Sequence, residues 1–512
     1  MTRGLEIRGA HLARNTALNL VGQVVPILVG VATIPYVVRG LGTDRFGVLS
    51  LAWALLGYVS LFDMGLGRAT TKFVAEALGR GELDTLPPLV WTSLGFQFLF
   101  GIAGAFLVAA LTPPLVGRVL KIPPGLLAET KTTFFILAAS LPVVLATNGF
   151  RGVLEAAQRF DWVNYVKAPA NVSVFLLPAA ALPFGLKLPG IVLLLILARV
   201  AATLAYLALC LKQFPALGRS FALDSKLLRP MLAYGGWITV SSVVGPVLLY
   251  GDRFFIASML SMTAVAYYTV PFEVITRVWI FPMSLVATLF PAFSTLSGGG
   301  ADERLATLYA RSVKSLLLIL GPPVLLVMVY ASTILRLWVG AEFAQKSTLV
   351  LQILALGVLI GSVAMVPFSL LQGLGRPDLT AKFHLLELPI YAVAAWYLVP
   401  AIGITGAAIA WTLRLLLDAC LLFGASRWLR FISPRALVES GVFRSAVALA
   451  AFGVVFLVPR FVGVSPQAQI LFALSAVSLF GLATWILLLD RSEKDLLGQA
   501  VARIFATLSR AK

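Results

Sequence analysis

The chain has 512 residues, of which 60% are hydrophobic and 12% charged, and its mean hydropathy is +0.95. This composition excludes an ordinary soluble enzyme or binding module, because a soluble domain alternates apolar and polar faces. The net charge is +18, but the basic residues are spread over many short segments. That spread argues against nucleic-acid binding and for an affinity to anionic lipid headgroups.

Apolar segments of about 20 residues follow one another from Asn15 to Leu489, a length that crosses a hydrocarbon core of about 30 Å. The backbone must bond internally in lipid, so each segment is predicted to be a helix. The fold class is therefore an all-α integral membrane protein with about 14 transmembrane helices. In chain order we predict helices at residues 15–38, 46–67, 87–111, 132–152, 169–185, 188–211, 231–257, 264–293, 313–332, 348–372, 382–400, 403–424, 443–459 and 467–489.

Two places in this series carry strong breaker signals. Pro183, Gly185 and Pro189 mark a turn between the fifth and sixth helices. The segment 264–293 is long and contains three prolines, so we expect it to tilt, to kink or to extend beyond the bilayer. Those prolines are Pro271, Pro282 and Pro291.

The distribution of basic residues predicts the orientation. Of the 40 Lys and Arg residues, 27 lie at the two termini, in every second loop or within two residues of the span ends that border these loops, nine lie in the alternate loops, and four lie deeper within spans. Loops rich in Lys and Arg stay in the cytoplasm, so both termini are predicted to be cytoplasmic. The bias also favours an even number of helices.

Spacing indicates two similar halves. Pro26 in the first helix and Pro246 in the seventh take equivalent places, and Arg199 in the sixth and Arg414 in the twelfth lie at similar depth. Such repeats are typical of secondary transporters with a substrate path between the lobes. The predicted organisation is a cytoplasmic N-terminus (1–14), an N-lobe of helices 1–6 (15–211), a cytoplasmic linker (212–230), a C-lobe of helices 7–12 (231–424), helices 13–14 (443–489) and a basic amphipathic tail on the cytoplasmic leaflet (490–512).

The sequence offers little for catalysis or for metal binding. Cys210 and Cys420 fall within predicted helices, where we expect buried apolar packing without a disulfide or metal role. The chain has two His residues and no phosphate-binding loop. We therefore expect no catalytic residues, no metal and no cofactor.

Three motifs resemble one family of exporters. The stretch from Pro35 to Gly47, with Arg39, Leu41 and Gly42 between them, resembles the Pro-x-x-x-Arg-x-Leu-Gly-x-x-x-Phe/Tyr-Gly signature of polysaccharide-export flippases. These O-antigen-type flippases belong to the multidrug/oligosaccharidyl-lipid/polysaccharide exporter superfamily. The family's patterns in the seventh helix and at the end of the tenth helix are similar to residues 252–256 with 267–268, and to residues 371–376.

The resemblance implies a two-lobe secondary transporter in the bacterial inner membrane. It implies that the protein flips an undecaprenyl-pyrophosphate-linked oligosaccharide for O-antigen, capsule or exopolysaccharide by alternating access, without ATP. The implied partners are the lipid-linked oligosaccharide, membrane lipids, a polysaccharide polymerase and other assembly proteins. A multidrug exporter of the same superfamily and a peptidoglycan-precursor flippase remain alternatives, as does, from another class, a membrane-bound polymerase or ligase of glycans.

A pyrophosphate carrier needs cations in a cavity screened from lipid, and Arg matches phosphate through two parallel hydrogen bonds. A charge at membrane depth is costly, so each one needs an explanation. The candidate pyrophosphate-binding residues are Arg199, Arg253, Arg277 and Arg414. Arg277 and Arg414 each have an acidic residue four positions away, Glu273 and Asp418, and pairing within the helix is the structural alternative for them. Arg199 has none.

A gradient-coupled carrier also needs a titratable group and a moving element. Glu273, Asp252 and Asp418 are the candidates for ion coupling. Asp63 and Glu387 are expected near cytoplasmic helix ends, where water would hydrate them. Pro26 and Pro246 are hinge candidates, since proline removes a helix hydrogen bond. Aromatic residues such as Trp53 and Tyr250 are candidates for stacking on sugar rings.

Overall fold

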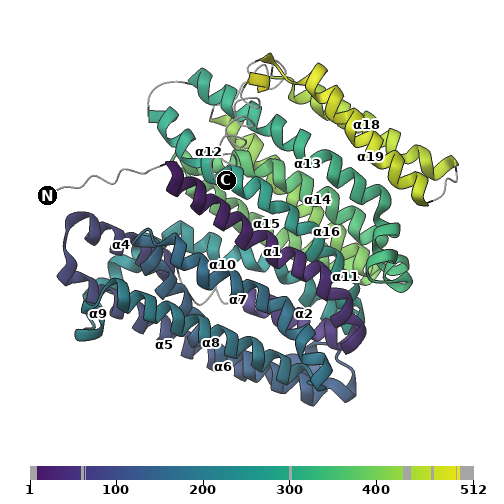
Figure 1. Cartoon of the computed structure of the whole chain (residues 1–512). Helices are drawn as coiled ribbons and strands as arrows, with labels where there is room; N and C mark the ends of the chain where they lie inside the picture. Colours follow the sequence, from purple (N-terminus) through teal and green to yellow (C-terminus); the bar gives the residue numbers. More distant parts are fainter. Residues whose placement is uncertain are drawn as a thin grey trace, which may run out of the picture. The chain divides into compact units, whose positions relative to one another are not determined.

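The computed structural model describes residues 9–58, 63, 65–298, 302–429, 440–462, 466–491 and 493–495, and within them the regular structure is helical throughout. Figure 1 shows the helices. The α-helices are α1 (Gly9–Leu41), α2 (Thr43–Gly57), α4 (Leu66–Arg80), α5 (Leu86–Pro114), α6 (Leu127–Ala156), α7 (Phe160–Ala181), α8 (Leu188–Gln213), α9 (Ala216–Arg219), α10 (Leu228–Met259), α11 (Met262–Ile275), α12 (Ile280–Gly298), α13 (Asp302–Trp338), α14 (Ala341–Gly373), α15 (Pro377–Ile402), α16 (Ile404–Trp428), α18 (Val442–Val462) and α19 (Pro466–Ala483).

The predicted all-α membrane fold is confirmed, and every predicted span overlaps a helix. Among the described residues, eleven helices are long and apolar enough to cross a membrane, and Val442–Phe456 is a shorter apolar helix. The full number of fourteen spans stays a prediction. Of the predicted amphipathic tail, residues 492 and 496–512 lie outside the described part of the chain.

Two predicted spans differ from the observed helices. The second was predicted to reach residue 67, but α2 ends at Gly57, and α4 occupies much of the loop expected next. α4 buries Leu66, Ala69 and Val74 on one face, so amphipathic packing stabilises it where an average of hydropathy gives no signal. The eighth is broken, as its prolines indicated. A 3₁₀ turn at Thr276–Trp279 separates α11 from α12, one turn before Pro282, whose nitrogen cannot bond to the carbonyl of Val278.

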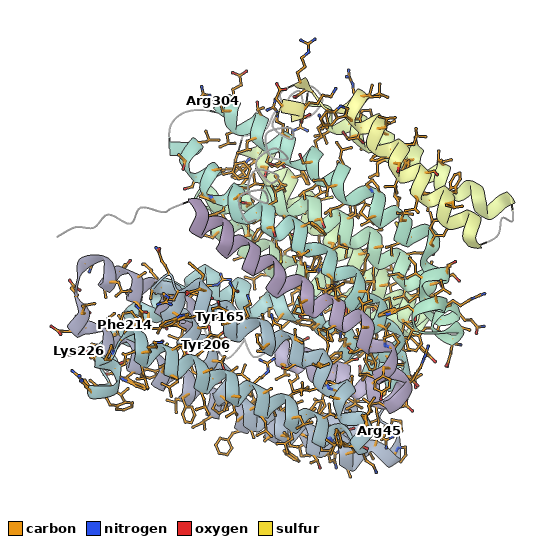
Figure 2. The ribbon with its side chains drawn as sticks, in the orientation of Figure 1. Arg45, Tyr165, Tyr206, Phe214, Lys226 and Arg304 are labelled. Carbon is orange, nitrogen blue, oxygen red and sulfur yellow. The ribbon has the colours of Figure 1, made fainter. Side chains whose placement is uncertain are left out.

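The chain divides into two compact units. The first contains Met1–Arg277, Arg336–Val350 and Pro377–Arg414, and the second contains Val278–Leu335, Leu351–Arg376 and Leu415–Lys512. In the first unit α6 packs between α5 and α8, α1 packs on α7, α11 on α2, and α15 on α10 (Figure 1). Figure 2 places Arg45 at one end of this helix layer and Lys226 at the other. In the second unit, α18 and α19 lie side by side.

Aromatic and aliphatic side chains fill both units. One core of the first unit gathers Val90, Phe150 and Tyr206, whose hydroxyl donates to the Val163 carbonyl over 3.1 Å. In the second unit Phe452 packs between Phe456 and Phe480, at centroid distances of 4.5 and 4.4 Å. These contacts use shape complementarity, because lipid offers helices no hydrophobic driving force for association.

The two cysteines are free and differ from each other. Cys210 is buried, as predicted, and its thiol donates to the Phe150 carbonyl over 3.3 Å. Cys420 is exposed on the surface of α16, so the prediction of burial was wrong for this residue. An apolar helix presents one face to lipid, and average hydropathy does not tell which face that is.

Glycines of the export-family signature have structural roles. Gly42 links α1 to α2 with φ of 80°, in the left-handed region that side chains disfavour. Gly47 lies where α2 meets α11, and a methyl group there would run into the carbonyl of Met262. This signature therefore sets the α1–α2 turn and lets two helix backbones approach closely.

We predict that Gly47→Ala lowers the stability of the folded protein by about 1–3 kcal/mol, because the extra methyl group forces α2 and α11 apart. Gly79→Ala is the matched control, since a methyl group at this helical position would meet nothing within 4 Å. The control is expected to be neutral or slightly stabilising. The measurement is the thermal midpoint of each purified variant in detergent. Equal midpoints for Gly47→Ala and the parent protein would contradict the close approach.

Candidate functional site

A cavity of about 230 Å³ lies within the first unit and contains most of the membrane-depth charges noted in the sequence. Its walls come from α2, α7, α8, α10 and α11, with Arg277 at the start of the 3₁₀ turn. The lining residues are Trp53, Leu56, Gly57, Ala170, Ser173, Val174, Phe175, Leu195, Arg199, Tyr250, Arg253, Glu273 and Arg277. Three of the four arginines predicted to bind pyrophosphate thus share one cavity.

Arg253 is the most deeply buried of these charges, with an exposed fraction of 0%. Its Nη2 donates to Glu273 Oε1 over 2.7 Å, and its guanidinium lies 5.0 and 5.1 Å from the ring centroids of Tyr250 and Phe272. Among the described residues, its remaining donors, Nε and Nη1, are buried and have no hydrogen-bond partner. A buried N–H that lacks an acceptor is costly, so an acceptor supplied by a ligand would stabilise this guanidinium.

Glu273 holds two arginines at once. Besides Arg253, it accepts a hydrogen bond from Arg277 Nη2 at Oε2 over 2.6 Å. The pairing predicted from the i, i+4 spacing of Glu273 and Arg277 is therefore confirmed. The contact with Arg253 lies 20 residues away in sequence and ties α10 to α11. The ring centroid of Phe175 lies 5.3 Å from the guanidinium carbon of Arg277.

Arg199 enters the cavity from α8 and is only partly exposed. Across the described part of the chain, no hydrogen bond or ion pair engages its guanidinium. The cavity lining contains three arginines and one glutamate, so its formal charge is +2. A cation that the protein leaves unneutralised in a membrane protein indicates a ligand of opposite charge.

Asp252 is not among the residues that line this cavity, and it is buried. It is 1% exposed, its Oδ2 accepts a 2.5 Å hydrogen bond from the Tyr268 hydroxyl, and its Oδ1 accepts one from the backbone N–H of Arg253. The neighbours Asp252 and Arg253 thus serve different partners, as expected for adjacent helix positions.

Arg414 is not part of the cavity lining. Its Nη1 lies 3.3 Å from Glu387 Oε2, and its guanidinium carbon lies 6.0 Å from the ring centroid of Trp411. Glu387 is 0% exposed, so the expectation that water hydrates it was wrong. Buried carboxylates persist when a cation neutralises them, and here the cation comes from the next helix. Asp418, the partner predicted for Arg414, is partly exposed in α16.

The hinge candidates occupy different surroundings. Pro26 is buried in α1 and lines a small recess together with Phe175, Glu273 and Arg277. Pro246 is partly buried in α10, two turns before Arg253. A distortion at Pro26 would therefore act directly on the charged cluster.

Sequence reasoning missed Ser173 and Phe175, which α7 contributes to the cavity wall. Ser173 is an isolated serine within an apolar helix, and this pattern could have predicted that its side of α7 lines a polar cavity. The position of Trp53 and Tyr250 on the cavity wall agrees with their selection as candidates for sugar stacking. No metal-ligating group was predicted, and the cavity chemistry is that of guanidinium and aromatic rings.

Comparison with known proteins identifies the family. Residues 12–297 match the family described as polysaccharide biosynthesis protein. A Shigella flexneri protein named "Putative O-antigen transporter" is 30% identical over 80% of this chain and 96% of its own length. A Haloferax volcanii protein named "Probable low-salt glycan biosynthesis flippase Agl15" is 25% identical over 85% of this chain and 88% of its own.

Solved structures show the same fold at low identity. The lipid II flippase MurJ in an inward closed conformation matches with a TM-score of 0.71 and 11% identity, over 92% of this chain and 98% of its own. An inward-facing multidrug resistance transporter of the MATE family, in the MOP superfamily, matches with a TM-score of 0.68 and 16% identity, over 82% and 99%. The chain is a multi-pass membrane protein with the fold of MOP-superfamily transporters, and it belongs to the polysaccharide biosynthesis protein family.

Proposed function

We propose that this protein flips an undecaprenyl-pyrophosphate-linked oligosaccharide across the bacterial inner membrane by alternating access of two six-helix lobes, residues 15–211 and 231–424. Both termini face the cytoplasm in this proposal. The family and the relatives named as O-antigen transporter and glycan flippase support the class of substrate. The charged cavity supports the way in which the substrate is held.

The charge and the hydrogen-bond donors of the cavity support the binding of a pyrophosphate. Its formal charge of +2 balances an anion that carries at least two negative charges. Arg253 offers two unused donors and Arg199 offers its whole guanidinium, and planar guanidinium groups bind phosphate oxygens in pairs. Trp53, Tyr250 and Phe175 add aromatic surface on which a sugar ring packs.

The single observation that carries this proposal is the unpaired state of Arg199. Arg277 and Arg414 each have an ion-pair partner, so packing alone explains them. Arg199 has no such explanation within the described chain, yet it lies in the candidate span Leu188–Gln213 and lines the same cavity as Arg253. A ligand phosphate supplies the missing counter-charge.

The positive charge of the cavity disfavours one alternative function and does not distinguish the other. A multidrug exporter that carries cationic drugs needs an acidic or neutral site, so a charge of +2 disfavours it. A peptidoglycan-precursor flippase also carries a pyrophosphate, and its cavity would need the same cations. The glycan attached to the lipid distinguishes these two substrates, and a flipping assay with both measures it directly.

Among the candidates for ion coupling, the contacts favour Asp252. Glu273 is held by two guanidinium groups, and its protonation would leave both of them without a counter-charge. Asp252 accepts only neutral donors, a phenol and a backbone N–H, so it tolerates a proton with smaller loss. Glu273 then positions Arg253 and Arg277, and Asp418 is the remaining candidate.

Arg199→Ala is expected to lower the rate of glycan flipping in proteoliposomes by about 10- to 100-fold, the range expected for one charge-assisted phosphate contact. Arg199→Lys is expected to recover part of the rate, because it keeps the charge without the paired donors. Arg118→Ala, at an exposed position outside the cavity, controls for loss of positive charge. A parental rate for Arg199→Ala at equal protein abundance would contradict the role of this residue.

The coupling proposal predicts opposite results for two carboxyl groups. If an ion gradient drives flipping, Asp252→Asn is expected to flip at a rate that no longer responds to collapse of the proton and sodium gradients. Glu273→Gln is expected to keep its response to the gradients while binding the substrate less well, because Arg253 and Arg277 lose the group that positions them. The measurement is flipping with and without ionophores. Flipping by the parent protein that ignores both gradients would eliminate ion coupling.

The predicted orientation is tested by labelling single cysteines. In a background with Cys210 and Cys420 replaced by Ser, a cysteine at Gly340, between α13 and α14 within the predicted 333–347 connection, is expected to react with an impermeant maleimide added outside the inner membrane. A cysteine in the 425–442 loop is expected to react only after the membrane is permeabilised. Removal of Cys420 matters because it is exposed on its helix. The reverse labelling pattern would overturn the orientation.

A further inference from the structure

The second unit contains a larger cavity that the transport proposal does not use. Its volume is about 720 Å³, and it lies between α12, the first half of α13 and the chain segment from Thr484 to Glu493. Leu285, Leu308, Leu318 and Ile319 form much of its wall, so most of the lining is apolar. This volume is within the range of sites that bury a drug-sized small molecule, so the cavity has room for part of a lipid. None of its lining residues belongs to the charged cavity of the first unit.

One end of this apolar cavity carries an unpaired cation and an unpaired anion. Glu303 and Arg304 lie in the first turn of α13, both are exposed, and both line the cavity. Figure 2 marks Arg304 near the start of that helix. Within the described chain, no hydrogen bond or ion pair engages either side chain. A ligand headgroup bound at this end would contact one negative and one positive side chain.

The other charges at the cavity are already neutralised. Lys314 Nζ lies 2.7 Å from Glu493 Oε2, and Arg311 Nη2 lies 3.2 Å from Asp490 Oδ2. These two pairs fix the end of the described chain against α13. The formal charge around the cavity is therefore zero, which disfavours an anionic headgroup and favours a zwitterionic one.

A hydroxyl without a partner belongs to the lining of the same cavity. The Oγ1 of Thr484 is buried and has no hydrogen-bond partner among the described residues, and Ser315 of α13 lines the cavity with it. A buried hydroxyl in apolar surroundings is unfavourable unless an acceptor reaches it. Along α13 the lining thus passes from the charged residues of the first turn, through Ser315, to Leu318 and Ile319, and a glycerophospholipid has its charged, polar and apolar groups in the same order.

We propose that this cavity binds a zwitterionic phospholipid whose headgroup carries a primary amine. Its phosphate lies on Arg304, its ammonium on Glu303, an ester oxygen accepts from Thr484, and an acyl chain packs along the wall of α13. A primary ammonium donates hydrogen bonds to a carboxylate, and a choline headgroup cannot. The lipid joins α12, α13 and the segment that follows α19, and this role is independent of the proposed transport activity.

The test compares lipids retained by full-length protein purified in mild detergent. Native mass spectrometry identifies the lipid, and the thermal midpoint is measured after addition of dioleoylphosphatidylethanolamine or dioleoylphosphatidylglycerol. We expect the parent protein to retain phosphatidylethanolamine and to gain more stability from it, since a ligand that binds the folded state raises its midpoint. Ser315→Trp, which fills the cavity, is expected to lower the retained lipid by about fivefold or more.

Two further variants keep the test decisive. Thr484→Val preserves shape and removes only the hydroxyl, so it carries the test if the tryptophan variant does not fold, and it is expected to lose retained lipid as well. Glu303→Lys is expected to shift the preference toward phosphatidylglycerol, because the mouth then becomes cationic. Leu204→Trp, on the exposed face of α8, is the control that should change nothing. Unchanged lipid in both cavity variants, or equal stabilisation of the parent protein by both lipids, would overturn the proposal, as would retention of a polyprenyl lipid alone.

Discussion

The cluster of Arg253, Glu273 and Arg277 is the constraint on which the first unit depends. Two cations and one anion are held at membrane depth, where a lone charge costs several kcal/mol. Glu273 stabilises both arginines at short distance and joins α10 to α11. It leaves the cluster with one positive charge and leaves two donors of Arg253 unused. The protein thus stabilises most of the charge it buries while leaving a net positive charge among the residues that line the cavity.

The local break after α11 makes this arrangement possible. The regular helix α11 ends at Ile275, and Arg277 belongs to the 3₁₀ turn at Thr276–Trp279 that follows it. Pro282 lies one turn after this 3₁₀ turn, and because its nitrogen cannot donate a hydrogen bond it accounts for the break. Gly47 lets α2 approach the start of α11. Arg199 then enters from α8 and adds the second surplus charge. The charged residues of the cavity therefore lie next to an interrupted helix, as in the binding sites that transporters form at broken helices.

Sequence reasoning succeeded where the determining interaction is local. Hydropathy predicted the helical membrane fold, the three prolines of segment 264–293 predicted that it would tilt, kink or extend beyond the bilayer, and i, i+4 spacing predicted the Glu273–Arg277 pair. It failed where the determining contact joins distant segments. Arg253 meets Glu273 from 20 positions away, and Arg414 meets Glu387 from 27 positions away. A single sequence does not tell which faces of two helices meet, and for the same reason the exposure of Cys420 and the buried face of α4 were not predicted.

The central claim is that the charged cavity binds pyrophosphate, and affinity tests it most directly. The measurement is the dissociation constant of purified protein for undecaprenyl pyrophosphate, compared with undecaprenyl phosphate, in the parent protein and in Arg199→Ala. We predict tighter binding of the pyrophosphate by the parent protein, and a loss of that preference in the variant because one of two surplus cations is gone. Equal affinity of the parent protein for both lipids, or an unchanged preference in Arg199→Ala, would contradict the claim.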